Sequence, residues 1–286
     1  SSPFFLMWTT TVPHSAVQAP ADEVKYYVDK LGDEEPCTNP GMYLPNRYPH
    51  ATYAAMVTHI DTQVGKLVKK LKDLGVWDNT IFIVSSDNGP ASNGNSPMEY
   101  FQSGGPFKCG KGWGKSSLHE GGIRMPFILH WGNNKNCRRI TRMSSFADLM
   151  PTLAEITGVN APENDGVSFA PTVLAETRGG QRYAKANDMI LPPQRDHEYL
   201  YWEYPASKGW VAVRMGEWKG IVRKVLKGNS EMELYNLNDD PQEQNDVAAS
   251  HPEIVRSMWS AVRESHCDAN PEVPKFCMDI NYPDSL

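Results

Sequence analysis

Two loops of this chain combine residue types that bind ions. In Ser85-Ser86-Asp87-Asn88-Gly89-Pro90, a carboxylate and a side-chain amide follow directly on a run of β-forming residues. Such oxygen donors suit a hard cation such as Ca²⁺ or Mg²⁺, although two donors do not complete a shell of about six or more. Asp, Asn, Gly and Pro also favour turns, so an ordinary turn is the alternative interpretation of this stretch.

The second loop, residues 107–126, mixes lysines with many glycines ahead of a predicted strand. Glycines let backbone N–H groups approach an anion, and a lysine ammonium supplies a compact positive charge, so this composition is typical of an anion site. A solvated surface loop is the alternative, because basic glycine-rich loops have many uses. His14, on a separate loop after an apolar run, adds a side chain that can donate a hydrogen bond or a proton.

The elements expected around these loops form an α/β unit. They are a strand from Pro3 to Thr10, helices from Ala21 to Leu31 and from Tyr53 to Leu74, strands from Thr80 to Ser86 and from Met125 to Trp131, and a helix from Ser145 to Thr157. Alternating strands and helices are typical of a parallel sheet with helices on both faces, in which ligands bind outside the carboxyl ends of the strands. Asp87 and His14 both follow such strand ends.

The pattern changes after roughly residue 190. The elements predicted there are strands from Tyr199 to Tyr204, Trp210 to Met215, Trp218 to Arg223 and Glu231 to Leu237, and a helix from Pro252 to His266. We therefore expect two domains, residues 1–190 and residues 191–286. The second is a small α+β domain with a short antiparallel sheet and one helix.

Composition excludes several classes of protein. The 286 residues carry a net charge of −6 and their lysines and arginines are spread along the chain, so nothing indicates a nucleic-acid partner. No apolar run approaches the ~20 residues of a transmembrane helix. The five cysteines lack CxxC or Cys/His spacing, which argues against a structural zinc site. Cys267 and Cys277 could close a short loop in an oxidising compartment.

A series of stretches occurs in a fixed order along nearly the whole chain. They are Phe4 to His14, Asp61 to Gly65, Asn79 to Gly89, Gly112 to Pro126, Asp148 to Leu153, Ala212 to Lys219, Glu233 to Leu237 and Asp240 to Glu243. In this order the chain resembles the type I sulfatases of the alkaline phosphatase superfamily, close to arylsulfatases and N-acetylhexosamine-6-sulfatases. The resemblance implies an α/β fold with part of an alkaline-phosphatase-like parallel sheet sandwiched by helices.

The resemblance also assigns roles to individual residues. It implies that Asp87 and Asn88 are ligands of the active-site Ca²⁺ and that His14 and Lys115 are catalytic residues that contact the sulfate ester. Lys115 would neutralise the sulfate oxygens, and His14 would donate a hydrogen bond or a proton near the leaving oxygen. Lys111 is the rival in the same loop, but the spacing Lys-x-x-x-x-Glu-Gly-Gly selects Lys115.

The sequence departs from the family at the nucleophile. Type I sulfatases use a formylglycine made from the cysteine of Cys-x-Pro-x-Arg, and none of the five cysteines lies in such a motif. In the family this motif and the remaining Ca²⁺ ligands lie upstream of every stretch matched here. We therefore expect a carboxyl-terminal portion of a sulfatase that begins inside a fold, is inactive alone and could self-associate through an exposed sheet.

The predicted function is hydrolysis of sulfuric esters in sulfated sugars or aryl sulfates. A phosphoryl hydrolase of the same superfamily is one alternative, and it would need a Ser or Thr nucleophile. A non-catalytic anion-binding module is the other, since a fold alone does not guarantee chemistry. The family suggests a periplasmic or secreted protein, with the lysosome as alternative, and the lack of an Asn-x-Ser/Thr acceptor favours a bacterial source.

Overall fold

The computed structural model describes residues 2–38, 44–92, 96–132, 137–267 and 278–283. The chain divides into two compact units. The first unit comprises Ser1–Gly75 and Ala91–Ser103, and the second unit comprises Val76–Pro90 and Gly104–Leu286. Each unit is described by itself below.

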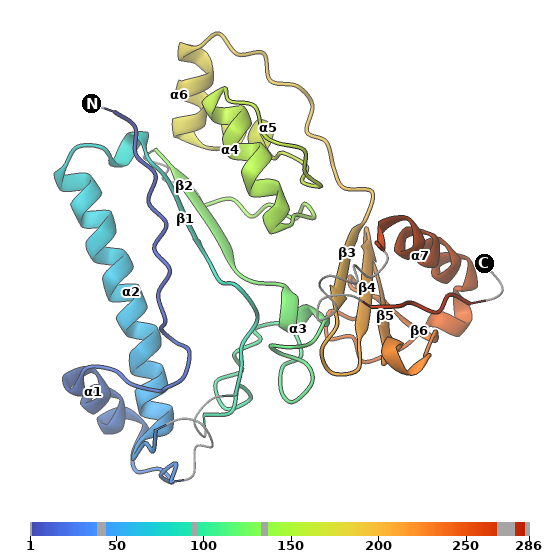
Figure 1. The fold of residues 1–286 in the computed structure, drawn as a ribbon. Coiled ribbons are helices and arrows are strands. Elements are labelled where there is room, and N and C mark those ends of the chain that lie inside the picture. The colour runs from blue at the N-terminus through green and yellow to red at the C-terminus, as the bar shows by residue number, and fades with distance from the viewer. Residues whose placement is uncertain (1, 39–43, 93–95, 133–136, 268–277, 284–286) are drawn as a thin grey trace. The chain divides into compact units, whose positions relative to one another are not determined.

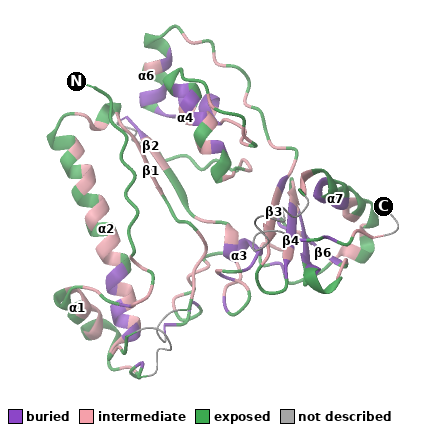
Figure 2. Ribbon diagram, in the orientation of Figure 1, coloured by how far each residue is buried: buried purple, intermediate pink, exposed green. Residues whose placement is uncertain are grey.

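The first unit is built on two helices, α1 (Ala21–Leu31) and the long α2 (Pro49–Asp73), which lie side by side (Figure 1). The hydroxyl groups of Tyr27 and Thr58 join them at 2.6 Å. Burial in α2 is concentrated near its amino-terminal end, as Figure 2 shows, where Ala55 and Met56 are buried. Both predicted helices are therefore confirmed, with α2 beginning earlier than its apolar pattern indicated.

The strand predicted from Pro3 to Thr10 is wrong. These residues form no strand, and their apolar side chains are exposed, with Phe5 81% accessible. A strand needs a neighbour for its backbone hydrogen bonds and a covered face for its side chains. Every strand that pairs in a sheet among the described residues belongs to the second unit, so this segment has no sheet of its own unit to join.

The second unit begins with a short 3₁₀ helix, η1 (Trp77–Asn79), and two paired strands, β1 (Ile81–Ser85) and β2 (Phe127–Trp131). The register joins Ile81 to Trp131 and Ser85 to Phe127, so the strands are antiparallel. The mixed α/β class is confirmed, but the parallel arrangement expected for these two strands is wrong. Apolar patterns identify strands without fixing their direction, which depends on how the long connection returns.

Three helices pack around the end of β2. After a 3₁₀ turn, η2 (Phe146–Asp148), come α4 (Leu149–Thr157), α5 (Ala170–Glu176) and α6 (Arg178–Ala186). Their shared core includes Trp131, Ile156 and Leu174. Pro151 is accommodated because it lies in the first turn of α4, where its missing N–H has no helical partner to lose.

The last part of the second unit is a four-stranded antiparallel sheet in the order β3-β4-β5-β6, with α7 (Pro252–Ser265) beside it (Figure 1). The strands are β3 (Leu200–Tyr204), β4 (Trp210–Met215), β5 (Trp218–Arg223) and β6 (Met232–Asn236). Two short 3₁₀ helices follow β5 and β6: η3 (Val225–Lys227) and η4 (Ala248–Ser250). The predicted strands and closing helix are confirmed. The proposed boundary near residue 190 stays a prediction.

Alternation along β4 and β5 gives this sheet two buried faces. Val211, Val213 and Val222 pack in one core with Trp259 and Val262 of α7. The intervening residues face a different neighbour: Ala212 and Ile221 share a core with Leu118, which lies in the glycine-rich loop of residues 107–126. Because successive strand residues point to opposite faces, the sheet holds α7 on one side and this loop on the other.

Candidate functional site

Asp87 and Asn88 lie directly after β1, as the sequence predicted. The Asp87 side chain is exposed and Asn88 is partly buried. Nearby hydroxyl groups fix the backbone, since Ser85 Oγ donates to Pro126 O at 2.8 Å and Ser86 Oγ donates to Asn88 O at 3.1 Å. Two side-chain oxygen donors are thus presented on a backbone that is tied to the start of β2.

Two main-chain hydrogen bonds join this loop to the loop that carries Lys115. Lys115 N donates to Pro90 O at 2.7 Å, and Gly89 N donates to Gly122 O at 2.9 Å. Residues about thirty positions apart in the sequence are therefore neighbours in the second unit. The backbone that carries Lys115 is therefore hydrogen-bonded directly to the backbone that carries Asp87 and Asn88.

Glycines make this close approach possible. A Cβ atom on Gly89 would lie 2.0 Å from the carbonyl oxygen of Gly121, and one on Gly121 would lie 2.1 Å from Lys108 O. Both distances are far shorter than any non-bonded contact between these atoms. A side chain on Gly89 would separate the two loops, and one on Gly121 would push apart two parts of the Lys115 loop. The glycine-rich composition thus has a packing role besides any role in anion binding.

A group of charges around a buried carboxylate anchors the Lys115 loop to the four-stranded sheet. This group, the Glu120 cluster, consists of Glu120, Arg124, Arg214, Lys219 and Glu243. Glu120 Oε1 lies 2.8 Å from Lys219 Nζ, and Glu120 Oε2 lies 2.9 Å from Arg124 and 3.4 Å from Arg214. The short helix α3 (Glu120–Ile123), which carries the carboxylate, is held further by Glu243 Oε2, which accepts the Glu120 N–H at 2.7 Å.

The electrostatics of the Glu120 cluster favour the ionised carboxylate. Burial raises the pKa of the Glu120 carboxyl, but Lys219, Arg214 and Arg124 act in the opposite direction and bring this pKa to about 2. Arg124 thus forms an ion pair with Glu120. The sequence analysis assigned no role to Lys219 or Glu243. Lys219 lies within an apolar strand pattern and is fully buried. A lysine in such a pattern is a sequence signal for a buried counter-charge.

His119 is packed within the protein, as expected for a structural histidine. Its side chain is buried and its ring stacks on Trp113 with the ring centroids 3.9 Å apart. Its Nδ1 lies 3.3 Å from Glu243 Oε1. Lys108 Nζ lies 3.8 Å from the centroid of the Trp113 ring. In the same loop Lys111 is exposed and Lys115 is partly buried.

His14 belongs to the first unit, unlike the other predicted site residues. It is exposed on the turn that follows residues 3–10, and its Nδ1 lies 2.9 Å from Ser15 O. The structure thus joins the Asp87-Asn88 and Lys115 loops within the second unit. The predicted role of His14 stays a prediction.

Within the described part of the chain, no group of three or more His, Cys, Asp or Glu side chains is arranged to hold a metal. Cys37, Cys137 and Cys267 form no disulfide among the described residues, and Cys277 lies outside them. A search of the described helices found none with the length and apolar character needed to cross a membrane.

Two family models match this chain. Residues 1–159 match the model described as Sulfatase, and residues 111–267 match the model described as N-sulphoglucosamine sulphohydrolase, C-terminal. Together the two matches extend over both units.

Individual relatives show the same likeness. The mouse N-acetylgalactosamine-6-sulfatase is 32% identical over 256 residues, which are 85% of this chain and 44% of the relative. The human N-acetylgalactosamine-6-sulfatase is 26% identical over 96% of this chain and 50% of its own length. A Bacteroides thetaiotaomicron N-acetylgalactosamine-6-O-sulfatase is 26% identical over 74% of this chain and 43% of its own length. The chain thus spans about half the length of the curated relatives it matches.

Solved structures agree with these relatives. The crystal structure of Ps i-CgsB in complex with k-i-k-neocarrahexaose matches with a TM-score of 0.64 and 25% identity, over 88% of this chain and 48% of that one. A structure described as BT4656 in complex with its substrate D-glucosamine-2-N,6-O-disulfate has a TM-score of 0.52 and 23% identity, over 77% and 40% of the two chains. The second match shows a shared fold.

Proposed function

The chain belongs to the sulfatase family, and from that membership we propose that it supplies the carboxyl-side half of the active site of a sulfuric ester hydrolase. The observation that carries the proposal is the pair of backbone hydrogen bonds between the Asp87-Asn88 loop and the Lys115 loop. These bonds hold together the two backbones that carry Asp87, Asn88 and Lys115, which supports a common site for a cation and an anion. A site that binds a sulfate ester together with a divalent cation needs oxygen ligands for the cation and a positive charge for the sulfate.

Lys115 is proposed to hold the sulfate group. Its ammonium would neutralise sulfate oxygens and keep the group in position for attack at sulfur, which is an electrostatic contribution that a preorganised charge makes well. Two features restrain the backbone that carries the Lys115 side chain. One is the hydrogen bond from Lys115 N to Pro90 O, and the other is the Glu120 cluster a few residues later. His14 is proposed to donate a hydrogen bond or a proton to the leaving oxygen.

Asp87 and Asn88 are proposed as two ligands of a Ca²⁺ ion. A carboxylate and a side-chain amide are donor types that Ca²⁺ accepts, so the residues present fit the ion, although two donors leave its shell incomplete. When bound, the ion would act as a Lewis acid toward the sulfate oxygens. The matched relatives contain a further half that this chain does not cover. We propose that the other Ca²⁺ ligands and the formylglycine nucleophile belong to a segment that corresponds to that half.

The substrate is proposed to be a sulfated sugar. The protein is proposed to act in the periplasm, outside the cell or in the lysosome. The names of the relatives support a sulfated sugar, because three of them are N-acetylgalactosamine 6-sulfatases. Self-association through an exposed sheet stays a prediction. A non-catalytic anion-binding module is the second candidate, because a fold alone does not guarantee chemistry.

The proposal is tested by joining this chain to the amino-terminal half of the mouse relative and assaying hydrolysis of a sulfated N-acetylgalactosamine. We expect hydrolysis by the joined protein and none by the chain alone. Lys115→Ala should lower turnover by about 100-fold or more, as expected for the loss of a preorganised charge. Lys111→Ala is the matched control in the same loop and should change turnover less than about twofold. Equal effects of the two substitutions would remove Lys115 from the site.

A further inference from the structure

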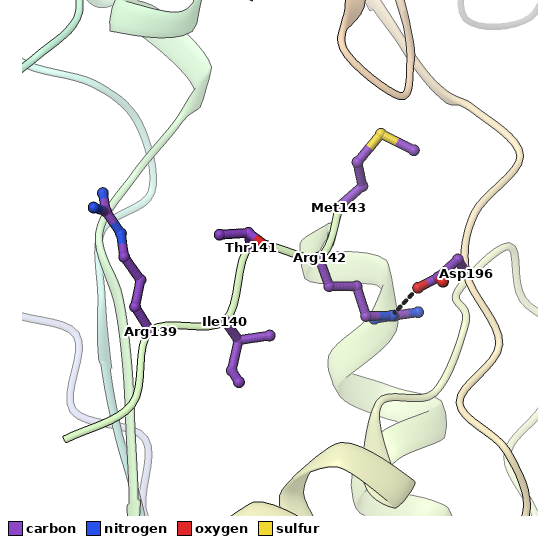
Figure 3. A pocket seen from close by; sticks show the side chains of 6 residues that line it. All are labelled: Arg139, Ile140, Thr141, Arg142, Met143 and Asp196. Carbon is purple, nitrogen blue, oxygen red and sulfur yellow. Dashed lines mark hydrogen bonds and ion pairs between the residues drawn. The ribbon is translucent and has the colours of Figure 1, made fainter. Parts of the chain in front are cut away.

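The segment between β2 and α4 forms one side of a hollow of about 530 Å³ in the second unit (Figure 3). The side chains that line the hollow are Arg139, Ile140, Thr141, Arg142, Met143 and Asp196. The hollow is wide and open to solvent, so it would hold a ligand along one side rather than enclose it. None of the lining residues belongs to the Asp87-Asn88 loop or the Lys115 loop.

One arginine of the hollow is held rigidly. The Arg142 side chain is only 8% exposed, and its Nε lies 2.8 Å from Asp196 Oδ1, the pair drawn in Figure 3. Its Nη2 donates to Arg195 O at 2.7 Å, and its Nη1 lies 3.3 Å from Ser144 Oγ. These bonds use one N–H on each nitrogen, and a guanidinium has five, so the anchored group retains donor capacity.

The charges around the hollow are unevenly balanced. Four arginines belong to it or adjoin it: Arg138, Arg139, Arg142 and Arg195. Two carboxylates neutralise two of them, because Glu176 pairs with Arg138 and Asp196 pairs with Arg142. Arg139 and Arg195 remain as exposed positive charges of this group, on a chain whose net charge is −6. Of the residues that line the hollow itself, Arg139 and Arg142 are opposed by Asp196 alone, so the lining has one positive charge in excess.

The lining combines what an anionic sugar requires. The planar guanidinium of Arg139 can bind a sulfate or carboxylate through two parallel hydrogen bonds. The Arg142–Asp196 pair offers a fixed donor and a fixed acceptor, and the Thr141 hydroxyl can serve as either, which suits sugar hydroxyl groups. Ile140 and Met143 provide apolar surface for the C–H faces of a sugar ring.

We propose that this hollow, the Arg139 pocket, is a second anion-binding site that holds a sulfated residue of an oligosaccharide. The identity of the ligand rests on the proposed function, which supplies the sulfated-glycan class, whereas the site itself rests on the arginines and the hollow. Such a site would hold a long substrate through a residue other than the one that loses its sulfate. Its effect would be larger for an oligosaccharide than for a small sulfate ester.

Binding of a chondroitin 6-sulfate hexasaccharide to the 286-residue chain, measured by calorimetry at low salt, tests the site directly. Arg139→Ala should weaken binding about tenfold or more, as expected when a charged hydrogen bond is lost. Arg256→Ala, which removes an exposed arginine from α7, is the matched control and should change the affinity less than about twofold. Equal losses in the two variants, no loss in Arg139→Ala, or equal affinity for the chemically desulfated hexasaccharide would each overturn the proposal.

The joined enzyme separates this proposal from the proposed function. Arg139→Ala should raise the KM for the hexasaccharide and leave the turnover of a small aryl sulfate unchanged, whereas Lys115→Ala should lower turnover of both. If the joined protein hydrolyses no ester while hexasaccharide binding still depends on Arg139, the proposed function fails and the Arg139 pocket stands. If hydrolysis is found but the Arg139 variant binds the hexasaccharide as well as the unmodified chain does, the pocket alone is overturned.

Discussion

Replacing Lys219 with methionine should unfold the second unit more easily, because it removes the central cation of the Glu120 cluster. Lys219 is fully buried, with its Nζ 2.8 Å from Glu120 Oε1 and 3.8 Å from Glu243 Oε1. Methionine keeps the length of the apolar stem and deletes the charge. Removing one partner of a buried ion pair typically costs about 3–5 kcal/mol, since the other charge stays buried without its counter-ion.

The pKa of Glu120 gives an independent magnitude. The carboxyl has an ordinary pKa of 4.5 when unfolded and about 2 when folded, so the ionised form favours the folded state by about 3 kcal/mol. A depressed folded pKa means that this stability is present above pH 4.5 and is lost as the pH falls toward 2. This figure is the net effect of burial and of Lys219, Arg214 and Arg124 together, with Lys219 the largest of the three cationic contributions.

Urea unfolding of the 286-residue chain, followed by tryptophan fluorescence at pH 7, measures the effect. We expect the midpoint of Lys219→Met to fall by about 1 M urea or more, given slopes of ~1–3 kcal/mol per molar urea. Lys111→Met is the control, because this lysine is exposed in the same loop, and it should stay within about 0.5 kcal/mol of the unmodified chain. A double substitution with Glu120→Gln should cost less than the sum of the single changes, since the charges that attract each other leave together.

Two outcomes would refute this reasoning. One is a Lys219→Met variant no less stable at pH 7 than the Lys111→Met control. The other is an unchanged loss of stability between pH 5 and pH 2 in Lys219→Met. Without Lys219, burial has less opposition and the pKa of Glu120 should rise toward its unfolded value, so the acid dependence should flatten.

Asp87→Ala should weaken Ca²⁺ binding by the joined protein at least about tenfold, measured by calorimetry, and an active variant insensitive to chelators would contradict the ligand assignment. Gly89→Ala should destabilise the second unit by about 1–3 kcal/mol in urea unfolding, since its Cβ would lie 2.0 Å from Gly121 O; unchanged stability would show that the two loops are not packed so closely. Gly65→Ala, where an added Cβ meets nothing within 4 Å on the exposed side of α2, should instead raise stability by about 0.5–1 kcal/mol, and a loss would indicate a covered helix face.

Sequence reasoning succeeded where a local pattern decides the structure. The strands β4 and β5 have the predicted ends, because apolar alternation and a two-residue turn at Gly216 fix both. The long α2 was recognised from its three-and-four spacing. In contrast, α5 and α6 were not predicted, since each is short and their burial comes from contacts with Trp131 and Ile156 rather than from a long periodic pattern.

Sequence reasoning failed where the outcome depends on distant partners. Residues 4–8 are apolar enough for a buried strand, yet they lie exposed because a strand is stable only beside another strand. The direction of β2 relative to β1 likewise depends on the course of the connection between them. For the site, the pattern identified the Asp87-Asn88 and Lys115 loops, but their main-chain link is invisible in a one-dimensional sequence.

The four-stranded sheet acts as a scaffold for the proposed site because both of its faces are used. Its residues alternate between the α7 core and the core that contains Leu118, so the same strands contact α7 on one face and the Lys115 loop on the other. The Glu120 cluster strengthens this link, since Lys219 of β5 and Glu243 both hold the short helix α3. Positions that are late in the sequence therefore fix the backbone of residues 115–122, which in turn bonds to Gly89 and Pro90. It follows that substitutions in β4 or β5 can alter the proposed sulfate site without touching a ligand, and that loss of activity in such variants must be separated from loss of folding before it is assigned to chemistry.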